Sequence, residues 1–336
     1  MKIAILTPTF SHFSGIDRVV ELQAQEYARK GNFVTVFALE ANLKPKGFRL
    51  EILGMPKRLF FQRLYRLFFF LDFIKRDKAA DKLKGYDLII SHQYPMNLIA
   101  STAKRHFGIR YVYHNHGIGH GSLFGSIFER VYMKLFGFFN KLSLNNVDEA
   151  VSISKFMQNE LKRETGISSK VVYDKIDTSR FKKGLDGSRI RKLLKIRQNE
   201  KLLLFVGRLS PHKNIHSLIE IFGIVNEKIP NSRLLIVGKP TFSGYFRKLK
   251  NIASKNVIFR ESVNDNELPH YYAACDLYVT ASLWEGFNLT IAEANACGKK
   301  AVAFDVCSHP EVIKDGILVK KNDAKGFADA VIRLLK

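Results

Sequence analysis

Apolar and polar positions alternate along the chain in two patterns, one typical of short strands and one typical of helices. Residues 2–7 form an apolar run that ends at Pro8 and predicts a strand buried on both faces. Residues 16–30 then have helical periodicity, and residues 32–39 are a second apolar run. The series continues with predicted strands at 87–91 and 111–116 and a helix at 97–107. This order is typical of a doubly wound α/β domain.

The same pattern begins again in the second half. The predicted strands there are 201–206, 232–237, 257–259, 277–280 and 301–304, and the predicted helices are 215–228, 246–255 and 324–335. We therefore predict two Rossmann-like doubly wound domains, residues 1–173 and 174–336, that face a central cleft. A chain of 336 residues suits two domains of ordinary size. In such sheets ligands bind beyond the carboxyl ends of the strands.

The composition is that of a folded, basic protein. Apolar residues make up 46% of the chain, and its formal net charge of +23 is spread over both halves. A basic surface favours nucleic acid, anionic lipid or phosphorylated substrates, unless the whole proteome is basic. The first residues do not resemble a signal peptide, no apolar run reaches about 18 residues, and Cys275, Cys297 and Cys307 lack metal-ligand spacing. We therefore expect a cytoplasmic protein without a membrane-spanning helix.

Two loops that follow predicted strands could bind an anion. Residues 11–18 open a helix at Gly15, but a plain strand–helix turn explains one glycine equally well. Gly-x-Gly-x-x-Gly does not occur there, which counts against a nicotinamide site. Residues 207–214 turn at Gly207 and carry Arg208 and Lys213. These cations could hold a diphosphate and stabilise the negative charge that develops on the diphosphate when it leaves its substrate. The alternative is that both are ordinary surface cations in contact with solvent.

Residues 282–298 carry two carboxylates, Glu285 and Glu293, around the predicted start of a helix near Leu289. The free N–H groups of that helix would point toward the same diphosphate. Glu285 lies in the loop before the helix, where it could accept hydrogen bonds from sugar hydroxyls, and Glu293 could accept them from a ribose. Ordinary capping carboxylates are the alternative.

The flanks of these residues carry a resemblance. Val206-Gly-Arg-Leu, then Lys213-Asn214, then Glu285-Gly-Phe-x-Leu-x-x-x-Glu293-Ala-x-Ala-Cys-Gly298 resemble the motifs of glycosyltransferase family 4. The resemblance covers nearly the whole chain, most specifically residues 202–311. It implies a GT-B fold and a retaining enzyme that moves a hexose from a UDP- or GDP-linked sugar, with the acceptor on the first domain and the donor on the second.

The resemblance also implies roles for individual residues. Arg208 and Lys213 would bind the diphosphate, Glu285 the donor sugar and Glu293 the ribose. The predicted catalytic residues are His116, Arg208, Lys213 and Glu285, and the predicted donor-binding residues are Gly15, Gly207, Arg208, Lys213, Glu285, Gly286, Phe287, Asn288, Leu289, Thr290 and Glu293. We expect no cofactor and no metal, because no Asp-x-Asp motif is placed to hold a divalent ion. A same-face internal return is expected rather than a covalent intermediate.

Some positions depart from the family pattern. Ser14 precedes Gly15 where the family usually has two glycines, and Asp174-Lys175 stands where it has Asn-Gly. Asn288 takes the place of a glycine, which leaves the donor sugar open. Members often continue after the last helix into one that crosses back to the first domain, so we expect looser domain closure here.

The acceptor side contains two segments, residues 58–76 and 123–142, that are both aromatic and basic. They could bind an anionic membrane at the inner face of the cell, which would suit a lipid-linked or envelope-glycan acceptor; burial in the core is the alternative. Other activities left open are a sugar phosphorylase, a nucleotide-sugar epimerase and a non-catalytic sugar- or nucleic-acid-binding protein. The even charge distribution counts against a nucleic-acid partner, and the oligomeric state stays open.

Overall fold

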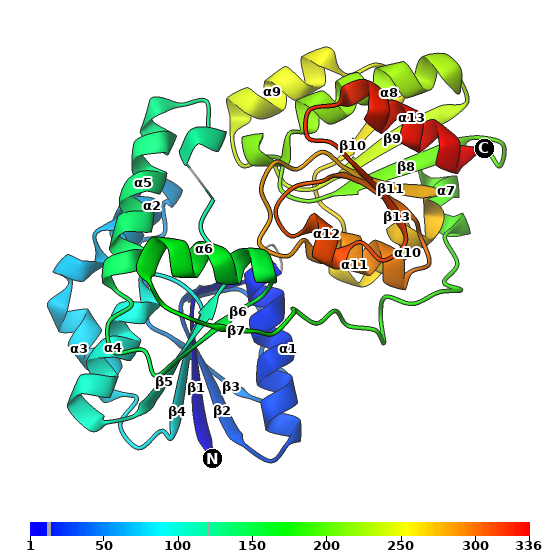
Figure 1. The fold of residues 1–336 in the computed structure, drawn as a ribbon. Coiled ribbons are helices and arrows are strands. Elements are labelled where there is room, and N and C mark those ends of the chain that lie inside the picture. The colour runs from blue at the N-terminus through cyan, green and yellow to red at the C-terminus, as the bar shows by residue number, and fades with distance from the viewer. Residues whose placement is uncertain (12–14, 120) are drawn as a thin grey trace. The chain divides into compact units, whose positions relative to one another are not determined.

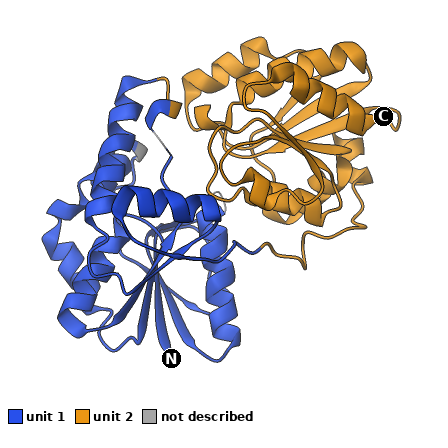
Figure 2. Ribbon diagram, viewed as in Figure 1, with its two compact units in different colours: residues 1–122, 126–175 blue, residues 123–125, 176–336 orange. Residues whose placement is uncertain are grey.

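The computed structural model describes residues 1–11, 15–119 and 121–336, which form two compact units (Figure 1, Figure 2). Unit 1 contains residues 1–122 and 126–175, and unit 2 contains residues 123–125 and 176–336. Each unit has one parallel sheet with helices on both faces, so the prediction of two α/β domains is confirmed. None of the helices in the described ranges combines the length and the apolar composition needed to cross a bilayer.

The sheet of unit 1 has the strand order β3-β2-β1-β4-β5-β6-β7, and all of its neighbours are parallel. Its strands are β1 (Lys2–Phe10), β2 (Phe33–Ala41), β3 (Arg49–Ile52), β4 (Leu88–Ser91), β5 (Arg110–Asn115), β6 (Glu149–Ser152) and β7 (Lys170–Val171). Its helices are α1 (Gly15–Arg29), α2 (Leu59–Leu67), α3 (Phe73–Asp81), α4 (Met96–Phe107), α5 (Ile127–Leu142) and α6 (Lys155–Thr165), with the 3₁₀ turn η1 (Phe69–Leu71). A second 3₁₀ turn, η2 (Gly121–Leu123), ends at the first of the three residues that belong to unit 2.

Strand β1 shows why its sequence is apolar throughout. Ile3 and Ile5 pack on one face of the sheet with Val20 of α1, whereas Ala4 and Leu6 belong to the core on the other face. Successive side chains of a strand point to opposite faces, so a sheet covered on both sides needs apolar residues at every position.

The first strand is longer than the sequence predicted, because β1 passes through Pro8 and ends at Phe10. Beyond Leu6, β2 is the only strand in the described residues that pairs with β1, since the pairing with β4 ends at Leu6 and Ser91. A proline lacks an N–H group and is tolerated where one side of a strand has no partner. Strand β5 is shorter than predicted at its carboxyl end. It stops at Asn115, so His116, which the sequence predicted to lie in the strand, is in the following loop.

The sheet of unit 2 has the strand order β10-β9-β8-β11-β12-β13, again parallel throughout. Its strands are β8 (Lys201–Val206), β9 (Ser232–Val237), β10 (Val257–Arg260), β11 (Leu277–Thr280), β12 (Ala301–Phe304) and β13 (Gly316–Val319). Its helices are α7 (Ser188–Leu193), α8 (Ile215–Lys228), α9 (Ser243–Ile252), α10 (Leu268–Ala274), α11 (Leu289–Ala296), α12 (His309–Val312) and α13 (Ala324–Leu335), with 3₁₀ turns η3 (Pro211–Lys213) and η4 (Asp265–Glu267).

Helices α8 and α13 cover one face of this sheet, where Phe222 and Phe327 pack against Phe205 and Phe304 in one apolar cluster. The ends of β8 and β9 lie very close together. A Cβ atom on Gly238 would be 1.8 Å from the carbonyl oxygen of Gly207, so only glycine fits there. The loop that leaves β8 therefore starts from a tightly packed base.

Candidate functional site

Unit 2 has a topological switch point between β8 and β11. These two strands are neighbours, while β9 lies on the far side of β8 and β12 on the far side of β11. The loops after β8 and β11 therefore leave the sheet in opposite directions, and a crevice is expected between them. The two loops are residues 207–214 and 281–288, which carry most of the predicted donor-binding residues. The backbone N–H of Leu283 donates to the carbonyl of His212 over 2.9 Å and joins them.

A buried ion pair lies between these loops. The Nζ of Lys213 is 2.6 Å from Oε1 of Glu285, and the two side chains are only 16% and 10% exposed. Lys213 ends the turn η3 (Pro211–Lys213), and Asn214 then takes a left-handed conformation from which α8 begins. Burial acts to raise the pKa of Glu285, but the charge and hydrogen bond of the neighbouring Lys213 oppose it, and the pKa lies below its usual value. Glu285 is therefore a carboxylate.

The loop that holds Glu285 is fixed by residues that sequence reasoning missed. The hydroxyl of Ser308 lies 3.1 Å from the carbonyl oxygen of Glu285 and 3.0 Å from that of Phe287, and it is fully buried. His309 begins α12, and its Nδ1 is 2.7 Å from the carbonyl oxygen of Phe304. Because that oxygen can only accept, Nδ1 carries the hydrogen and Nε2 of His309 is an acceptor.

The side-chain amide of Asn288 donates a hydrogen bond to Nε2 of His309. Its Nδ2 is 2.9 Å from the Nε2 of His309, and its Oδ1 is 2.7 Å from the hydroxyl of Thr290. The φ of Asn288 is +74°, a left-handed conformation that glycine and asparagine adopt most readily. The backbone turn therefore explains why asparagine can stand where a glycine was expected, and the side chain it adds is held by His309.

Glu293 is held from a different helix. It lies on α11 with 4% of its surface exposed, and its Oε2 accepts a 2.7 Å hydrogen bond from the hydroxyl of Tyr272 on α10. Burial, reinforced by the charge of Glu293, raises the pKa of Tyr272 well above its usual value, so this hydroxyl remains a donor. Arg208, by contrast, has an exposed side chain in the loop after Gly207.

The structure thus brings the predicted unit 2 residues to one edge of one sheet, from Gly207 and Lys213 to the stretch 285–290 and Glu293. Their roles in donor binding stay predictions. His309 and Ser308 follow a predicted strand, but what marks them as part of the site is their burial. No local pattern in the sequence reveals that burial.

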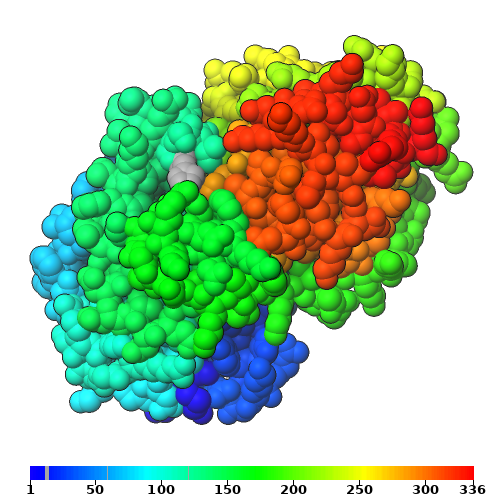
Figure 3. Space-filling view, in the orientation of Figure 1, coloured from blue at the N-terminus to red at the C-terminus, as the bar shows by residue number. Residues whose placement is uncertain are grey.

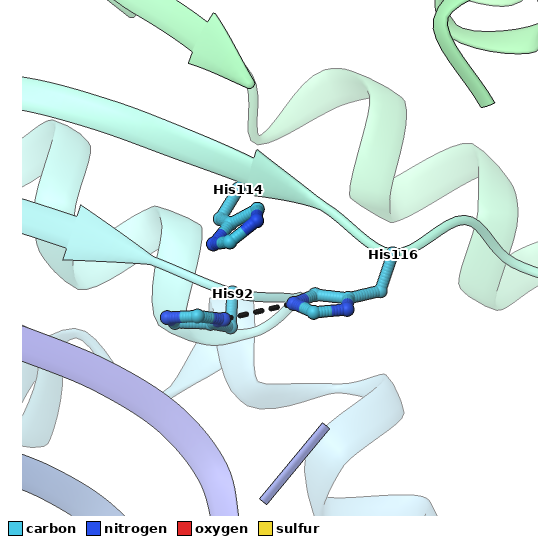
Figure 4. A group of neighbouring side chains, drawn as sticks. All are labelled: His92, His114 and His116. Atoms are coloured by element: carbon cyan, nitrogen blue, oxygen red, sulfur yellow. Dashed lines mark hydrogen bonds between the residues drawn. The ribbon is translucent and has the colours of Figure 1, made fainter. Parts of the chain in front are cut away.

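The predicted unit 1 residues lie at the corresponding edge of the other sheet. Gly15 is the first residue of α1, while residues 12–14 of its loop, including Ser14, lie outside the described residues. His116 follows β5 and is buried, and its Nε2 is 2.8 Å from Nδ1 of His92 (Figure 4). Burial, and then the neighbouring His114, lowers the pKa of His116 well below its usual value, so its ring is neutral.

Comparison with known proteins matches both halves of the chain to sequence families. Residues 13–180 match the model described as Glycosyltransferase Family 4, and residues 186–336 match the model described as Glycosyl transferases group 1.

Two curated relatives are an Escherichia coli UDP-Gal:alpha-D-GlcNAc-diphosphoundecaprenol alpha-1,3-galactosyltransferase and a Mycobacterium ulcerans D-inositol 3-phosphate glycosyltransferase. The first is 28% identical over 75% of this chain and 67% of its own length, and the second is 26% identical over 78% and 59%. The alignments thus span roughly three fifths to two thirds of these relatives.

Two solved structures have a similar fold. The Anabaena protein HepE, solved with UDP and glucose, has a TM-score of 0.77 at 22% identity and covers 100% of this chain and 90% of its own. Sucrose-phosphate synthase from Thermosynechococcus elongatus has a TM-score of 0.81 at 21% identity and covers 99% and 89%. Both are GT-B glycosyltransferases, and at these identities they show the fold. Because the two family models together match almost every residue, the chain belongs to glycosyltransferase family 4, and it has the GT-B fold.

Proposed function

We propose that this glycosyltransferase moves a hexose from a nucleotide diphosphate sugar, UDP- or GDP-linked, to a lipid-linked or envelope-glycan acceptor, with retention and without a divalent metal. The observation that carries the donor part is the buried Lys213–Glu285 pair at the switch point of unit 2. It is supported by the donor in the name of the Escherichia coli relative and by the UDP and glucose in the HepE structure.

The chemistry follows from where charge develops. As the bond from the sugar C1 to the diphosphate breaks, negative charge grows on the leaving oxygen. Lys213 is held in place by Glu285, Arg208 has an exposed guanidinium in the same loop, and the N-terminus of α11 contributes free N–H groups. Groups that are already fixed stabilise this charge without reorganising, and they take the part that a divalent cation has in other transferases.

The donor proposal is tested with a panel of nucleotide sugars and Lys213→Met. A ligand that binds only the folded state raises the melting temperature, and we expect at least one uridine or guanosine diphosphate sugar to do so for the wild-type chain. Lys213→Met should lose most of the shift, whereas Lys228→Met, an exposed lysine at the other end of α8, should keep it. No shift with any of these sugars would contradict the proposed donor site.

Transfer itself is measured as nucleotide release that depends on an added acceptor. A phosphorylase would require inorganic phosphate, and an epimerase would change the sugar without releasing nucleotide. NMR of the product's anomeric proton tests retention, and unchanged transfer in the presence of a chelator tests metal independence.

The acceptor part of the proposal rests on exposed apolar side chains of residues 60–74 and 127–142 in unit 1, which we call the α2–α5 face. Buried side chains such as Phe69 and Phe136 anchor these segments in the core, but most of the others are exposed. The exposed apolar side chains of the face are Phe60, Phe61, Leu64, Phe68, Leu71, Phe73, Ile74, Ile127, Phe128, Val131, Leu135, Phe138 and Leu142. The surface of α5 appears in blue-green in Figure 3. An apolar surface of this extent on a basic protein is typical of an interaction site.

Helices α2 and α5 are held together as one platform. Arg63 of α2 makes two hydrogen bonds of 2.8 and 2.6 Å with the carboxylate of Glu129 on α5, and its guanidinium lies 4.4 Å from the ring centre of Tyr132. Exposed cations of α5, among them Arg130 and Lys134, lie on the same helix as its exposed aromatic side chains. Apolar side chains that enter the lipid and cations that attract anionic headgroups are the features of an interfacial helix.

This surface is tested by flotation with vesicles of phosphatidylcholine, alone or mixed with phosphatidylglycerol. We expect binding that increases with phosphatidylglycerol and falls at least about 10-fold in the double variant Phe128→Ser/Phe138→Ser, because each ring contributes about 1.5–3 kcal/mol when it leaves water. Ile252→Ser, an exposed apolar residue of unit 2, is the matched control and should bind normally. Equal flotation with both vesicle types would contradict the membrane proposal.

A further inference from the structure

Three histidines of unit 1 lie together at the carboxyl ends of two neighbouring strands. Ser91, the last residue of β4, pairs with Tyr113 of β5, so His92 comes next to His114. His114 and His116 are two residues apart, on either side of the last residue of β5, and their ring centres are 4.8 Å apart. Figure 4 shows the three rings gathered at this edge of the sheet. All are at most 7% exposed.

The ring nitrogens of the three side chains converge. One ring nitrogen from each histidine can be chosen so that all three lie within 4.8 Å of one another. The closest two, Nδ1 of His92 and Nε2 of His116, are 2.8 Å apart, and the ring centre of His114 is 4.9 and 4.8 Å from the other two. Two nitrogens bound to one tetrahedral zinc ion are about 3.3 Å apart, so small rotations of the side chains would bring all three into range.

A metal ion binds the neutral form of imidazole, and burial of all three rings at no more than 7% exposure disfavours the charged form.

Gln23 of α1 orients the cluster from outside. Its side-chain oxygen is 2.9 Å from Nε2 of His92, and because that oxygen can only accept, the hydrogen of His92 is on Nε2 and the lone pair of Nδ1 faces the other two rings. Metal-binding histidines usually have such an outer hydrogen bond, which fixes the ring and its tautomer. The amide nitrogen of Gln23 is 3.5 Å from Nδ1 of His114.

His114 supplies a second, independent observation. Its Nε2 is buried and has no hydrogen-bond partner in the part of the chain that the structure describes. A buried polar nitrogen without a partner is unfavourable, and coordination by this ring to a metal ion is one way in which the arrangement would be satisfied.

We propose that His92, His114 and His116 form a binding site for a divalent transition metal of the zinc class, with three imidazole ligands and a fourth position for water. Imidazole nitrogens favour zinc, cobalt, nickel and copper over magnesium and calcium, which prefer oxygen ligands. When the ion binds, Nε2 of His116 gives up its proton to solvent while Nδ1 of the same ring takes one up, so the ring stays neutral and the freed lone pair on Nε2 coordinates the ion. The site consists of unit 1 residues alone, and it includes His116, so a metal-ligand role would replace the catalytic role that the resemblance implies for this residue.

The test is a titration of the metal-free full-length chain with Co²⁺, without any nucleotide sugar, so that its result does not depend on the proposed function. Four-coordinate Co²⁺ has visible absorption bands, and we expect these to saturate at one equivalent and to disappear when Zn²⁺ is added. His114→Gln and His92→Gln should each weaken the binding at least 10-fold. His106→Gln, an exposed histidine of α4, is the matched control and should bind like the wild type.

Several results would overturn the site. These are visible bands that do not saturate, equal affinity in His114→Gln, or an equal loss in His106→Gln. Bands from thiolate-to-cobalt charge transfer would place the ion at a cysteine, all of which are in unit 2. If the histidine variants do not fold by circular dichroism, Gln23→Leu decides: removing an outer hydrogen bond should weaken binding about 10-fold, and unchanged affinity would contradict the proposal.

Discussion

The two units use the same sheet architecture to build two chemically different edges. In unit 2 the strand order reverses between β8 and β11, and the edge there carries the buried Lys213–Glu285 ion pair. In unit 1 it reverses between β1 and β4, and the edge there carries three neutral histidines that contact one another. Topology therefore places a crevice in each unit, but the side chains decide its chemistry, and we propose an anion site in unit 2 and a metal site in unit 1.

The two edges differ because the ionisable side chains buried in each have different neighbours to offset the cost of burial. Burial alone would raise the pKa of Glu285, but a cation 2.6 Å away keeps it charged. Burial lowers the pKa of His114, and the neighbouring rings offer it no carboxylate to oppose this effect. A buried group stays ionised only where an opposite charge or sufficient hydrogen bonds accompany it.

Breaking the ion pair should give the largest effect. Glu285→Gln leaves the charge of Lys213 buried without its partner, so we expect unit 2 to lose about 3–5 kcal/mol of stability and transfer to fall at least about 100-fold. The double variant Lys213→Met/Glu285→Gln removes both charges and should recover stability but not transfer. Trp284, the single tryptophan of the chain, reports the unfolding of unit 2 in urea. Equal stability of the single and double variants would show that the pair is not coupled.

The histidine edge should be sensitive to acid. His114 has a pKa of about 4 in the folded chain and about 6.5 when unfolded, so between these values only the unfolded state binds the proton. Stability is therefore full above about pH 6.5 and falls as the pH drops, by about 3 kcal/mol for this residue at pH 4. His114→Gln should flatten the decline. Hydrogen exchange of the β4 and β5 amides measures this loss of stability in unit 1. A pH profile that is the same in the variant as in the wild type would contradict the role given to His114.

Unit 2 also contains buried histidines with lowered pKa values, His212 and His309, so the wild-type pH profiles alone do not separate the two units. Comparing the pH profiles of the wild type and His114→Gln separates the two units, since this substitution changes only unit 1. His106→Gln serves as its control here as well.

The smallest effect concerns Asn288, where backbone and side chain can be separated. Asn288→Gly keeps the left-handed turn but removes the amide that pairs with Nε2 of His309, so we expect a loss of about 1–2 kcal/mol. Asn288→Ala loses the same bond and adds about 1 kcal/mol of backbone strain. Trp284 fluorescence in urea measures both, and the preference among donor sugars should change in the glycine variant. Equal losses in the two variants would mean that the turn contributes nothing.

Local pattern predicted much of the fold. The strands 201–206, 232–237, 277–280 and 301–304 and the helices 215–228 and 324–335 match the structure residue for residue. Long apolar runs and strong helical periodicity are properties of neighbouring residues, so they can be recognised without tertiary information. Four short strands, β3, β6, β7 and β13, escaped prediction, because each has only two to four residues and their partly exposed positions are not consistently apolar. Helix α9 spans Ser243–Ile252 rather than 246–255, a shift of three residues at each end, because helix ends are the part of an element that a local pattern fixes least.

The candidate donor site was predicted as a set of residues, because Arg208, Lys213, Glu285 and Glu293 occur in a recognisable order and spacing. Their contacts were not. The sequence assigned Lys213 to a diphosphate, and only the fold showed that it pairs with a carboxylate 72 positions away.

By itself, then, the sequence determined the two parallel sheets, the family and the loops that carry its motifs, since each depends on short-range order. Tertiary structure alone decided which apolar side chains are core and which are surface: Phe128 and Phe136 lie two turns apart on one helix, yet the first is 83% exposed and the second 8%. It also decided that His92 joins His114 and His116. Contacts between residues far apart in the chain depend on strand order and register, which no local pattern specifies.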